Sequence, residues 1–383
     1  MNHPYFQRLR RIKQLGLTNL VYPGALHTRF HHALGAMHLM HEAITVLRQK
    51  QIDISEKEKQ AALIAILLHD IGHGPFSHTL EHSIVKGVNH ETLSSLMMNR
   101  LNEEFGGKLD LALQIFNDRY KKKFLHQLVS SQLDMDRLDY LMRDSFFTGV
   151  SEGVIGSERI IKMLNVLHGE LVVEYKAIYS IEKFLIARRL MYWQVYLHKT
   201  VLGAEMLLVN ILKRAKELSQ AGNNLFATPA LNLFLSHDIG KKDFENDKTL
   251  LDEFAKLDDH DIVTSIKVWC NHPDKVLSTL SDNLLNRRLY KVIIQNQKFS
   301  KTEISALVQK VEKKYKVNAH EARYFVVSDK VNNKAYNINK FNINMLGAGG
   351  KPIDVADASD LLNLKSLSKT VTKYFLCYPK EMD

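Results

Sequence analysis

The stretch "LLHDIGHGPFSH" (67–78) places three histidines and one aspartate within twelve positions, directly after an apolar run. His69 and Asp70 are therefore expected at the end of a buried helix. Burying this pair without a partner would cost several kcal/mol, and a bound cation would remove that cost. Imidazole and carboxylate together suit a divalent transition metal such as Mn, Fe, Zn or Ni. A hydrogen-bonded His–Asp pair in a core is the alternative.

A metal needs further ligands, and two other stretches offer them. Downstream, "QLDMDRLDYLMRD" (132–144) spaces Asp136, Tyr140 and Asp144 at i, i+4 and i+8, which puts them on one face of a helix. A solvated charged face is the alternative there, because Asp134 and Asp139 lie in the same stretch. Upstream, "HTRFHHALGAMHL" (27–39) offers four competing histidines, His27, His31, His32 and His38.

A second polar stripe lies in "RRLMYWQVYLHK" (188–199). Arg188, Tyr192 and Tyr196 are again spaced at i, i+4 and i+8. An arginine beside tyrosines suits a ligand that carries both phosphate and a ring.

The dipeptide His-Asp occurs twice more, at His237–Asp238 and His260–Asp261. Neither copy follows a fully apolar helix or leads into further histidines. One lies next to a predicted loop and the other in an acidic, surface-like run. Both are expected to be non-catalytic.

The composition is that of an ordinary globular protein: 383 residues, 45% hydrophobic and 25% charged. The net charge of +10 favours polyanions such as nucleic acid, nucleotides or acidic lipid, unless it is a dispersed solubility charge. Two distant cysteines, Cys270 and Cys377, indicate neither a disulfide framework nor a zinc ribbon, and fit a reducing, cytoplasmic compartment. No signal-peptide apolar region or membrane-spanning run is found.

The elements that must position these residues are mostly helical. Helical periodicity covers 32–50, 56–70, 124–144 and 181–218, the last as one helix or two. A hairpin is expected at 167–178, a loop at 219–230, and further helix to about 296. Beyond 300 the pattern predicts a helix at 302–315 and short strands at 322–329, 341–346 and 373–378. We therefore predict a mainly α protein with a core at 1–218, a helical extension at 219–299 and a small α+β region at 300–383.

With the order H…HD…D in place, the chain resembles the HD-domain phosphohydrolase superfamily. Within it, the chain is most similar to the deoxynucleoside triphosphate triphosphohydrolases related to the SAM-and-HD-domain enzyme. The matching stretches cover residues 6–200 in the family's order: "FQRLRRIKQLG", "YPGALHTRFHHALG", "LLHDIGHGPFSH", "NHE", "LDMDRLDYLMRD" and "RRLMYWQVYLHK". The resemblance implies an HD-type helical core that hydrolyses dNTPs to deoxynucleoside and tripolyphosphate. It also implies a homo-oligomer, a dimer or tetramer, with a possible nucleotide effector.

The resemblance implies roles residue by residue. The ligands of a divalent cation (Mn, Fe, Zn, Ni or Mg) would be His32, His69, Asp70 and Asp136. The residues of proton transfer would be His73, His90 and Glu81. The phosphate-binding residues would be Arg29, His78, Arg137, Tyr140 and Arg188. Gln14 and Asp144 would hold the sugar 3′-hydroxyl, and Tyr196 would crowd the 2′ position and so favour deoxyribose.

Three positions depart from the family's pattern: Arg137 replaces a lysine, Leu197 a base-contacting glutamine and Glu81 an aspartate. Base preference is thereby left open. Gln7 and Arg10 match part of the family's nucleotide-activation site. Two other functions remain open, another HD-type nucleotide phosphohydrolase (a nucleotidase or phosphodiesterase) and a non-catalytic nucleotide- or nucleic-acid-binding protein.

Overall fold

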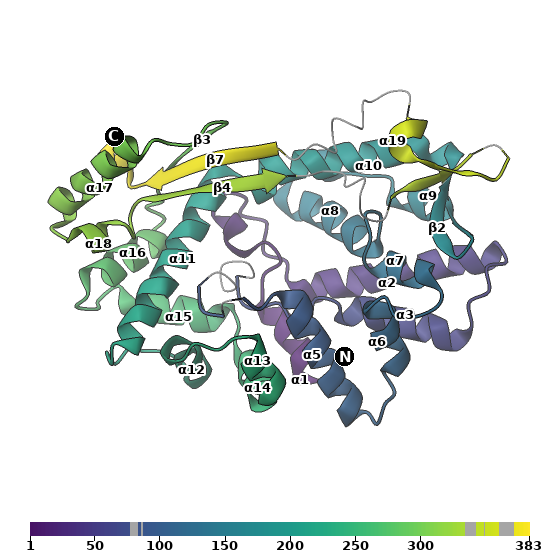
Figure 1. The fold of residues 1–383 in the computed structure, drawn as a ribbon, viewed down its shortest axis with the longest axis horizontal. Coiled ribbons are helices and arrows are strands. Elements are labelled where there is room, and N and C mark those ends of the chain that lie inside the picture. Colours follow the sequence, from purple (N-terminus) through teal and green to yellow (C-terminus); the bar gives the residue numbers. More distant parts are fainter. Residues whose placement is uncertain (77–82, 86, 334–341, 348, 360–370) are drawn as a thin grey trace.

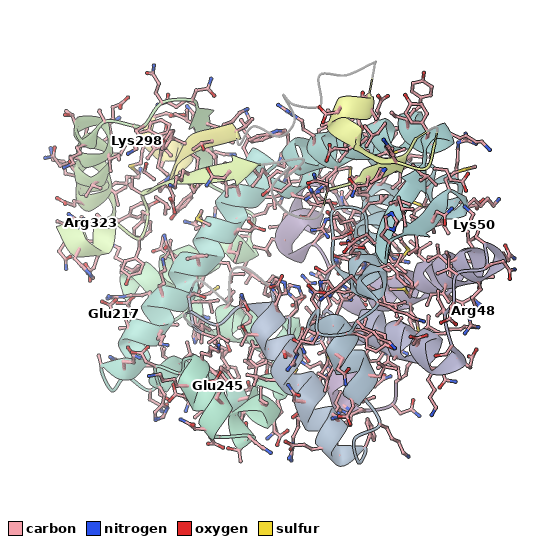
Figure 2. The ribbon with its side chains drawn as sticks, turned by 45° about the vertical axis from the view of Figure 1, so that its right-hand side comes forward. Arg48, Lys50, Glu217, Glu245, Lys298 and Arg323 are labelled. Carbon is pink, nitrogen blue, oxygen red and sulfur yellow. The ribbon has the colours of Figure 1, made fainter. Side chains whose placement is uncertain are left out.

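A computed structural model describes residues 1–76, 83–85, 87–333, 342–347, 349–359 and 371–383. The chain is mainly helical, and the strands form two small sheets (Figure 1). The predicted fold class, a helical core with a small α+β region toward the C-terminus, is confirmed. Exposed charged residues include Glu245, Lys298 and Arg323 (Figure 2).

Three helices form the centre of the first half. They are α2 (Arg29–Gln49), α3 (Glu56–Leu68) and α8 (Met135–Thr148), and α2 packs against both of the others. α3 begins at a capping box in which Ser55 and Glu58 bond to each other's backbone N–H groups. Its alanines and Ile66 are buried, and it ends at Leu68 with His69 as the C-cap. The predicted buried helix therefore delivers the His-Asp pair at its C-terminal end.

The single helix expected at 124–144 is wrong. The segment forms α7 (Lys123–Val129), a break, and then α8, which begins at Met135. The break is local in origin, because the buried Asp134 carboxylate accepts hydrogen bonds from the backbone N–H groups of Ser131 and Arg137, each at 2.7 Å. An aspartate cap competes with helix continuation in this way. Asp136 consequently lies in the first turn of a new helix.

The hairpin expected at 167–178 is present slightly earlier. β1 (Leu164–Leu167) pairs antiparallel with β2 (Glu170–Glu174) through a two-residue turn, in which His168 and Gly169 both have positive φ. The segment expected as one helix or two is two, α10 (Ile178–Met191) and α11 (Lys199–Gln220). They are joined by a π-helical turn at Tyr192–Tyr196, and the two segments are bent by 56°.

The second half is helical as far as Leu285. The expected continuation of helix to about 296 is wrong, because Lys291–Gln295 is strand β3. β3 pairs with β7 (Val371–Tyr378), which also pairs with β4 (Val327–Asn333), so the strand predicted at 322–329 begins later than expected. The helices here are α12 (Pro229–Ser236), α13 (Lys241–Asn246), α14 (Thr249–Lys256), α15 (Asp259–Trp269), α16 (Lys275–Leu285), α17 (Lys301–Tyr315) and α18 (Ala319–Ala322).

Strand pairing crosses the predicted boundaries near 218 and 300. β3 of the helical extension joins β7, and β5 (Asn344–Leu346) pairs parallel with β2 of the core and antiparallel with β6 (Pro352–Asp354). The three-part division stays a prediction. The remaining helices are α1 (Pro4–Gln7), the 3-10 turns Arg8–Arg11 and Gly16–Leu20, α5 (His90–Glu104), α6 (Asp110–Phe116), α9 (Ser157–Lys162) and α19 (Val355–Ala358).

Two apolar clusters make up the core, and the end of α3 lies between them. Ala65 and Ile66 pack in the cluster that contains α2, α8 and α10. Leu68 and Ile71 pack in the cluster that contains α5, α11 and the C-terminal sheet. No single helix in the described ranges is long and apolar enough to cross a membrane; the bent pair Tyr175–Tyr196 and Lys199–Gln220 meets that test of length and composition together.

Candidate metal centre and nucleotide site

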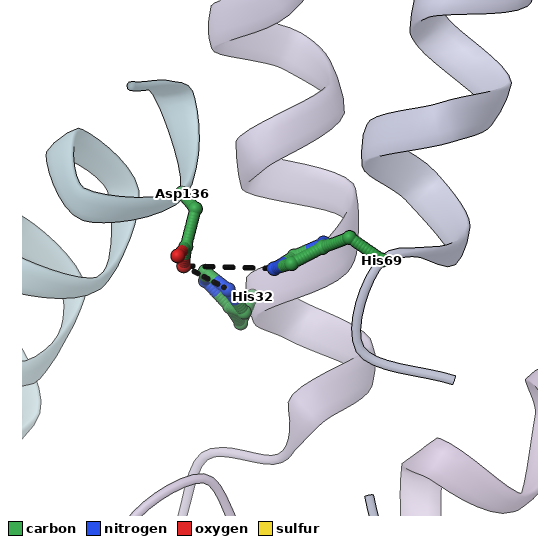
Figure 3. A group of neighbouring side chains, drawn as sticks. All are labelled: His32, His69 and Asp136. Atoms are coloured by element: carbon green, nitrogen blue, oxygen red, sulfur yellow. Dashed lines mark ion pairs between the residues drawn. The ribbon is translucent and has the colours of Figure 1, made fainter. Parts of the chain in front are cut away.

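Three side chains from three helices meet at the junction of the two apolar clusters. His32 comes from α2, His69 from the C-cap of α3 and Asp136 from the first turn of α8 (Figure 3). Asp136 Oδ1 lies 3.1 Å from His32 Nε2 and 3.5 Å from His69 Nε2. One potential ligand atom from each residue lies within 4.8 Å of the others.

The second ring nitrogen of each histidine is already engaged. His69 Nδ1 lies 2.6 Å from the carbonyl oxygen of Ile66, which can only accept a hydrogen bond. His32 Nδ1 lies 2.7 Å from Asp139 Oδ2. In the neutral rings these contacts put the proton on Nδ1 and leave a lone pair on Nε2.

Both Nε2 atoms are buried and make no hydrogen bond within the described residues, although both face the Asp136 carboxylate. Two lone pairs and a carboxylate pointing at one another repel unless a proton or a cation lies between them. Metal-binding histidines are usually held by such a bond from the other nitrogen. The donor set therefore fits a divalent cation, and His32, His69 and Asp136 would hold it.

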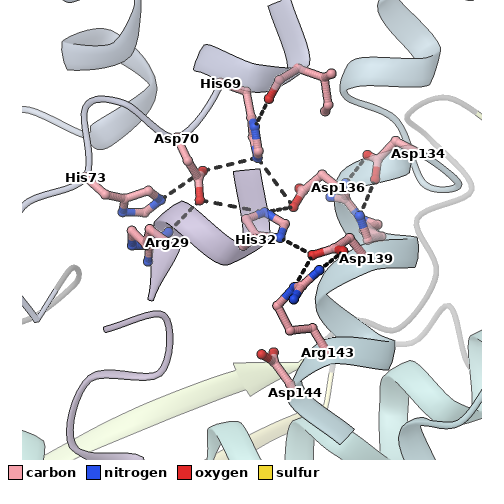
Figure 4. Close-up of polar contacts among 12 residues, drawn as sticks. Arg29, His32, His69, Asp70, His73, Asp134, Asp136, Asp139, Arg143 and Asp144 are labelled. Atoms are coloured by element: carbon pink, nitrogen blue, oxygen red, sulfur yellow. Dashed lines mark hydrogen bonds and ion pairs between the residues drawn. The ribbon is translucent and has the colours of Figure 1, made fainter. Parts of the chain in front are cut away.

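A glycine in α2 makes room for the group that orients His32. A Cβ at Gly35 would lie 1.9 Å from Asp139 Oδ1 and 2.1 Å from Arg143 Nη2. Asp139 is buried and accepts two hydrogen bonds from Arg143, at 2.8 and 2.9 Å, besides its contact with His32 (Figure 4). Sequence reasoning assigned Asp139 and Arg143 no role. Their i, i+4 spacing, opposite a helix-interior glycine, was the available signal.

Asp70 lies beside the three ligands and contacts nitrogen atoms of several neighbouring side chains. Its Oδ1 lies 3.3 Å from both His69 Nε2 and His73 Nε2. Its Oδ2 accepts a 2.6 Å hydrogen bond from Arg29 and lies 3.8 Å from His32 Nε2. Burial would raise the pKa of Asp70, but His69, His73 and Arg29 hold it well below 3.8. Asp70 is thus an ionised carboxylate within reach of a fourth ligand position.

The histidine pKa values divide the site into two parts. Burial lowers the pKa of His32, but the Asp136 and Asp139 carboxylates outweigh burial and raise it well above 6.5. Burial also lowers the pKa of His69, and Asp70 and Asp136 raise it overall. At His73 burial and Arg29 prevail, and the pKa falls well below 6.5. His73 is therefore neutral beside the Arg29 guanidinium.

His73 and His90 lie face to face. Their ring centroids are 3.8 Å apart and the planes differ by 14°. His90 is the first residue of α5, and Gly72 packs against the same turn: a Cβ at Gly72 would meet Ser94 N at 2.2 Å and the His90 carbonyl oxygen at 2.5 Å. The turn after Asp70 thus needs a glycine at 72 for close approach, whereas the positive φ falls on Phe76. His78 and Glu81 lie outside the described residues.

The two polar stripes meet where Tyr140 and Asp144 contact Tyr196. Buried Asp144 lies 2.8 Å from His27 Nε2 and accepts a 2.8 Å hydrogen bond from the Tyr196 hydroxyl. The Tyr140 and Tyr196 rings pack edge to face, 6.1 Å apart. His27, a competitor for the metal in the sequence, instead supports Asp144. Tyr192 turns away and bonds the Asn332 carbonyl oxygen of β4.

Polar atoms in this region lack partners within the described part of the chain. They are Gln14 Oε1 and Arg188 Nη1, both buried without a hydrogen bond. Arg188 lies close enough to lower the pKa of Tyr140, although burial raises that pKa overall. Arg137 pairs with Asp134, and its Nη1 lies 4.0 Å from Asp136 Oδ2. Buried groups of this kind are satisfied when a polar ligand binds.

Comparison with known proteins identifies the family. A family model described as an HD domain matches residues 29–143, and one described as an HD associated region matches residues 155–226. The uncharacterized protein YwfO of Bacillus subtilis is 31% identical over 392 residues, covering 98% of this chain and 87% of YwfO. The crystal structure of a phosphohydrolase from Bacteroides thetaiotaomicron is 54% identical, with a TM-score of 0.95 over 98% of this chain and 94% of that one. The chain belongs to the HD-domain phosphohydrolase superfamily.

A more distant relative of this HD-domain protein has a named activity. The Dictyostelium discoideum protein named deoxynucleoside triphosphate triphosphohydrolase SAMHD1 homolog is 30% identical over 239 residues. The match covers 57% of this chain and 46% of that protein. HD domains bind divalent metals, in agreement with the cluster of His32, His69 and Asp136.

A cleft of about 670 Å³ opens the HD centre to the surface. Its inner end is formed by His69, Asp70 and Asp136, and its walls come from α5, α7 and α13. Tyr140, Asp144, Arg188 and Tyr196 do not line it. The cleft therefore reaches the ligands, and the buried Asp144 group lies outside it.

The two other His-Asp copies lie outside this centre. Asp238 is exposed and forms an ion pair with Lys216 at 2.8 Å. Asp261 bonds the backbone N–H of Asp258 in the capping box of α15, and His260 is exposed. Both copies serve local structure.

Proposed function

We propose that this HD-domain protein is a metal-dependent triphosphohydrolase that converts dNTPs to deoxynucleoside and tripolyphosphate. The observation that carries the proposal is the Asp144 group beside the ligand cluster. A carboxylate held by His27 and Tyr196 offers a fixed acceptor for a sugar hydroxyl, and Gln14 Oε1 is a second buried acceptor. The similarity to the Dictyostelium protein supports the same substrate class.

Deoxyribose preference follows from Tyr196. Burial, with Asp144 beside it, raises the pKa of this phenol well above 10, so it stays a protonated donor to the carboxylate. Its ring is fixed by that bond and by the edge-to-face contact with Tyr140. A ring held rigidly beside the sugar leaves little room for a 2′-hydroxyl.

His32, His69, Asp136 and Asp70 would hold the cation. When bound, the cation supplies Lewis-acid polarisation of a phosphoryl oxygen at the α-phosphorus. Arg188, Arg137 and Arg29 offset the charge of the departing polyphosphate, and Tyr140 donates to it. These side chains come from helices α10, α8 and α2, so the groups that bind the polyphosphate stand on rigid elements.

The proton balance of the reaction requires an acid near the 5′-oxygen. The oxygen of water joins the α-phosphorus, the bond from phosphorus to O5′ breaks, and O5′ takes up a proton. His90 supplies this proton, because its imidazole lines the cleft beside His69 and Asp70 and imidazole is the commonest proton-transfer group. His73, the alternative donor, stacks on His90; because burial and Arg29 lower its pKa well below 6.5, it holds the His90 ring in place rather than supplying the proton. Glu81 is the proposed partner of His90.

The direct test is product analysis. Each dNTP and NTP is incubated with the protein and Mn²⁺ or Mg²⁺, with and without GTP, and products are separated by anion exchange. We expect tripolyphosphate and deoxynucleoside, lost in His69→Ala and Asp136→Asn. Release of orthophosphate or pyrophosphate would reject the triphosphohydrolase in favour of another HD-type activity, a nucleotidase or phosphodiesterase. Turnover of no nucleotide, with metal still bound, would favour a nucleotide- or nucleic-acid-binding protein.

The cleft favours a phosphodiesterase as the second candidate. A substrate with a bulky group on both sides of the phosphorus would use the Asp144 side and the cleft together. Its wall offers polar and charged side chains, including Asn117, His126 and Lys241. Hydrolysis of a phosphodiester such as bis-p-nitrophenyl phosphate in preference to dNTPs would decide for this activity.

We also propose a nucleotide effector near the N-terminus and a homo-oligomer. Arg10 stacks on the Phe30 ring, 3.6 Å from its centroid, and donates to Gln7 Oε1 at 2.9 Å. The exposed Arg10 guanidinium and the half-buried Gln7 amide suit a guanine nucleotide. GTP-dependent turnover that is lost in Arg10→Ala would support the effector, and sedimentation with and without GTP measures assembly.

A further inference from the structure

Arg8 is completely buried, and its guanidinium donates hydrogen bonds to the turn that follows Asp70. It lies in the 3-10 turn Arg8–Arg11 and has no exposed surface. Its Nη1 donates to the carbonyl oxygens of Ile71 at 3.0 Å and His73 at 2.8 Å. Its Nη2 donates to the carbonyl oxygen of Leu257 at 3.3 Å. One side chain thus joins the N-terminal segment, the turn after Asp70 and the end of α14.

Asp259 binds the same turn at its C-terminal end, at Phe76. It is the first residue of α15 and is buried. Its Oδ1 accepts a hydrogen bond from the backbone N–H of Phe76 at 3.3 Å, and its Oδ2 accepts one from Lys13 N at 3.0 Å. Phe76 has a φ of 50°, a conformation that a bulky side chain rarely adopts. The segment from Ile71 to Phe76 is therefore held at both ends by side chains from outside the HD helices.

Burying the Arg8 guanidinium in this position costs desolvation free energy. Among the described residues Arg8 forms no ion pair with a carboxylate, and its partners are carbonyl oxygens. Burial lowers the pKa of its guanidinium to about 10. A buried charge of this kind is hard to justify by stability alone, because apolar side chains of similar volume usually serve as well. What the guanidinium adds is direction, since Nη1 fixes two peptide carbonyls of one turn while Nη2 holds the Leu257 carbonyl at the end of α14.

We propose that Arg8 and Asp259 are positioning residues that hold the Ile71–Phe76 turn so that His73 meets Asp70 and stacks on His90. His73 Nε2 lies 3.3 Å from Asp70 Oδ1, and its ring lies 3.8 Å from that of His90. Both contacts depend on the peptide planes that Arg8 fixes. The role in turnover rests on the proposed function of the site. The hydrogen bonds by which Arg8 and Asp259 hold the turn, here called the clamp, do not depend on that function.

The clamp also gives the helices beyond 219 a part in the site. Leu257 and Asp259 belong to the α14–α15 junction, and Arg8 and Lys13 to the N-terminal segment. Displacement of either segment would move the His73 turn and leave the cation ligands His32 and Asp136 in place.

The test compares Arg8→Met and Arg8→Lys with a matched control, Arg11→Met. Arg11 lies in the same 3-10 turn and pairs with Asp258, the N-cap of α15, but makes no hydrogen bond or ion pair with residues 71–76, all of which the structure describes. Three quantities are measured on the full chain: amide hydrogen exchange, Mn²⁺ affinity by calorimetry, and kcat and KM for dNTP.

In Arg8→Met we expect exchange in peptides covering 70–76 to rise at least tenfold, with α2 and α8 unchanged. Mn²⁺ affinity should stay within about threefold, and kcat should fall about 100-fold at little change in KM, as for a catalytic group displaced by about 1 Å. Arg8→Lys should retain part of kcat, and Arg11→Met should behave as wild type.

Unchanged exchange at 70–76 and unchanged kcat in folded Arg8→Met would overturn the proposal. Equal loosening of α2, α8 and the turn would also overturn it, since the role would then be general stability. If Arg8→Met does not fold, Asp259→Asn is measured instead, with the same expected pattern at 70–76. If wild type turns over no dNTP, the proposed function has failed, and the exchange measurement alone decides whether the clamp exists.

Discussion

Replacing Gly35 by alanine should weaken metal binding while leaving the fold intact. A Cβ at this position would lie 1.9 Å from Asp139 Oδ1, 2.8 Å from Asp139 Cγ and 2.1 Å from Arg143 Nη2. The carboxylate has to move by more than 1 Å to restore ordinary contact distances of about 3.4 Å. That movement breaks the 2.7 Å contact with His32 Nδ1, so the ring is no longer fixed with its Nε2 lone pair toward Asp136.

The expected size follows from the role of Asp139 behind a ligand. Loss of such a supporting group typically lowers metal affinity 10- to 100-fold, or about 1.4–2.8 kcal/mol. Helix propensity acts in the opposite direction, since alanine is favoured over glycine by about 1 kcal/mol in a helix interior. The two effects are separable, because one appears in metal binding and the other in the unfolding of metal-free protein.

The assay is titration of Mn²⁺ into chelator-stripped protein, followed by thermal unfolding of the metal-free form. Gly35→Ala should bind Mn²⁺ at least tenfold more weakly and unfold within a few degrees of wild type. Gly203→Ala is the control, because Gly203 is also a helix-interior glycine, in α11, and its nearest neighbour would be Val292 Cγ2 at 3.0 Å. Wild-type Mn²⁺ affinity in Gly35→Ala would refute the assignment of Asp139 as the support of His32.

Three further outcomes are expected. Tyr196→Phe should lower kcat/KM for dNTP about tenfold, through loss of a hydrogen bond to a charged group, while Tyr196→Ala should raise NTP turnover relative to dNTP; steady-state kinetics with matched dNTP and NTP pairs measures both. Gly72→Ala should unfold or inactivate the protein, since the added Cβ meets backbone atoms of α5 at 2.2 and 2.5 Å, and circular dichroism with a melting curve tells which. Burial would raise the pKa of Glu58, but hydrogen bonds from Tyr120, Ser55 and Lys122 outweigh it and lower the pKa to about 2. The ionised carboxylate therefore stabilises the folded protein by roughly 2–3 kcal/mol above pH 4.5, and this contribution is lost as the pH falls toward 2. Glu58→Gln should lower the free energy of unfolding, measured in urea, at pH 7 and much less at pH 2.5.

The ligand cluster could be foreseen because its members sit at fixed places on helices. An apolar run that ends in His-Asp places both residues at the end of a buried helix, and a period of four aligns Asp136 with Tyr140 and Asp144. Choosing His32 among four neighbouring histidines needed the family resemblance. In the structure His27 turns to Asp144 instead, which spacing alone does not reveal.

The supports of the site could not be foreseen, because they depend on contacts between distant segments. Arg8 and Ile71 are 63 positions apart, and Asp139 meets His32 across 107. The α7–α8 break was missed for a different reason. The periodicity of 124–144 is helical on both sides, and only the capping bonds of Asp134 interrupt it. Strand β3 was missed because "KVIIQ" is a short apolar run that reads equally as a helix.

The position of the centre explains why its supports come from so far away. The ligands lie where two apolar clusters meet, and each cluster fixes a different part of the chemistry. His69 and His32 are held by contacts with the Ile66 carbonyl of α3 and with Asp139 of α8, so metal binding should survive changes at the N-terminal segment and the α14–α15 junction. The His73 turn, by contrast, is fixed by Arg8, Asp259 and α5, whose apolar neighbours Leu9, Leu257 and Leu93 belong to the second cluster. Perturbing the N-terminal segment or the α14–α15 junction should therefore change turnover before it changes metal affinity, and an effector bound near Arg10 would act on the part of the site that transfers the proton.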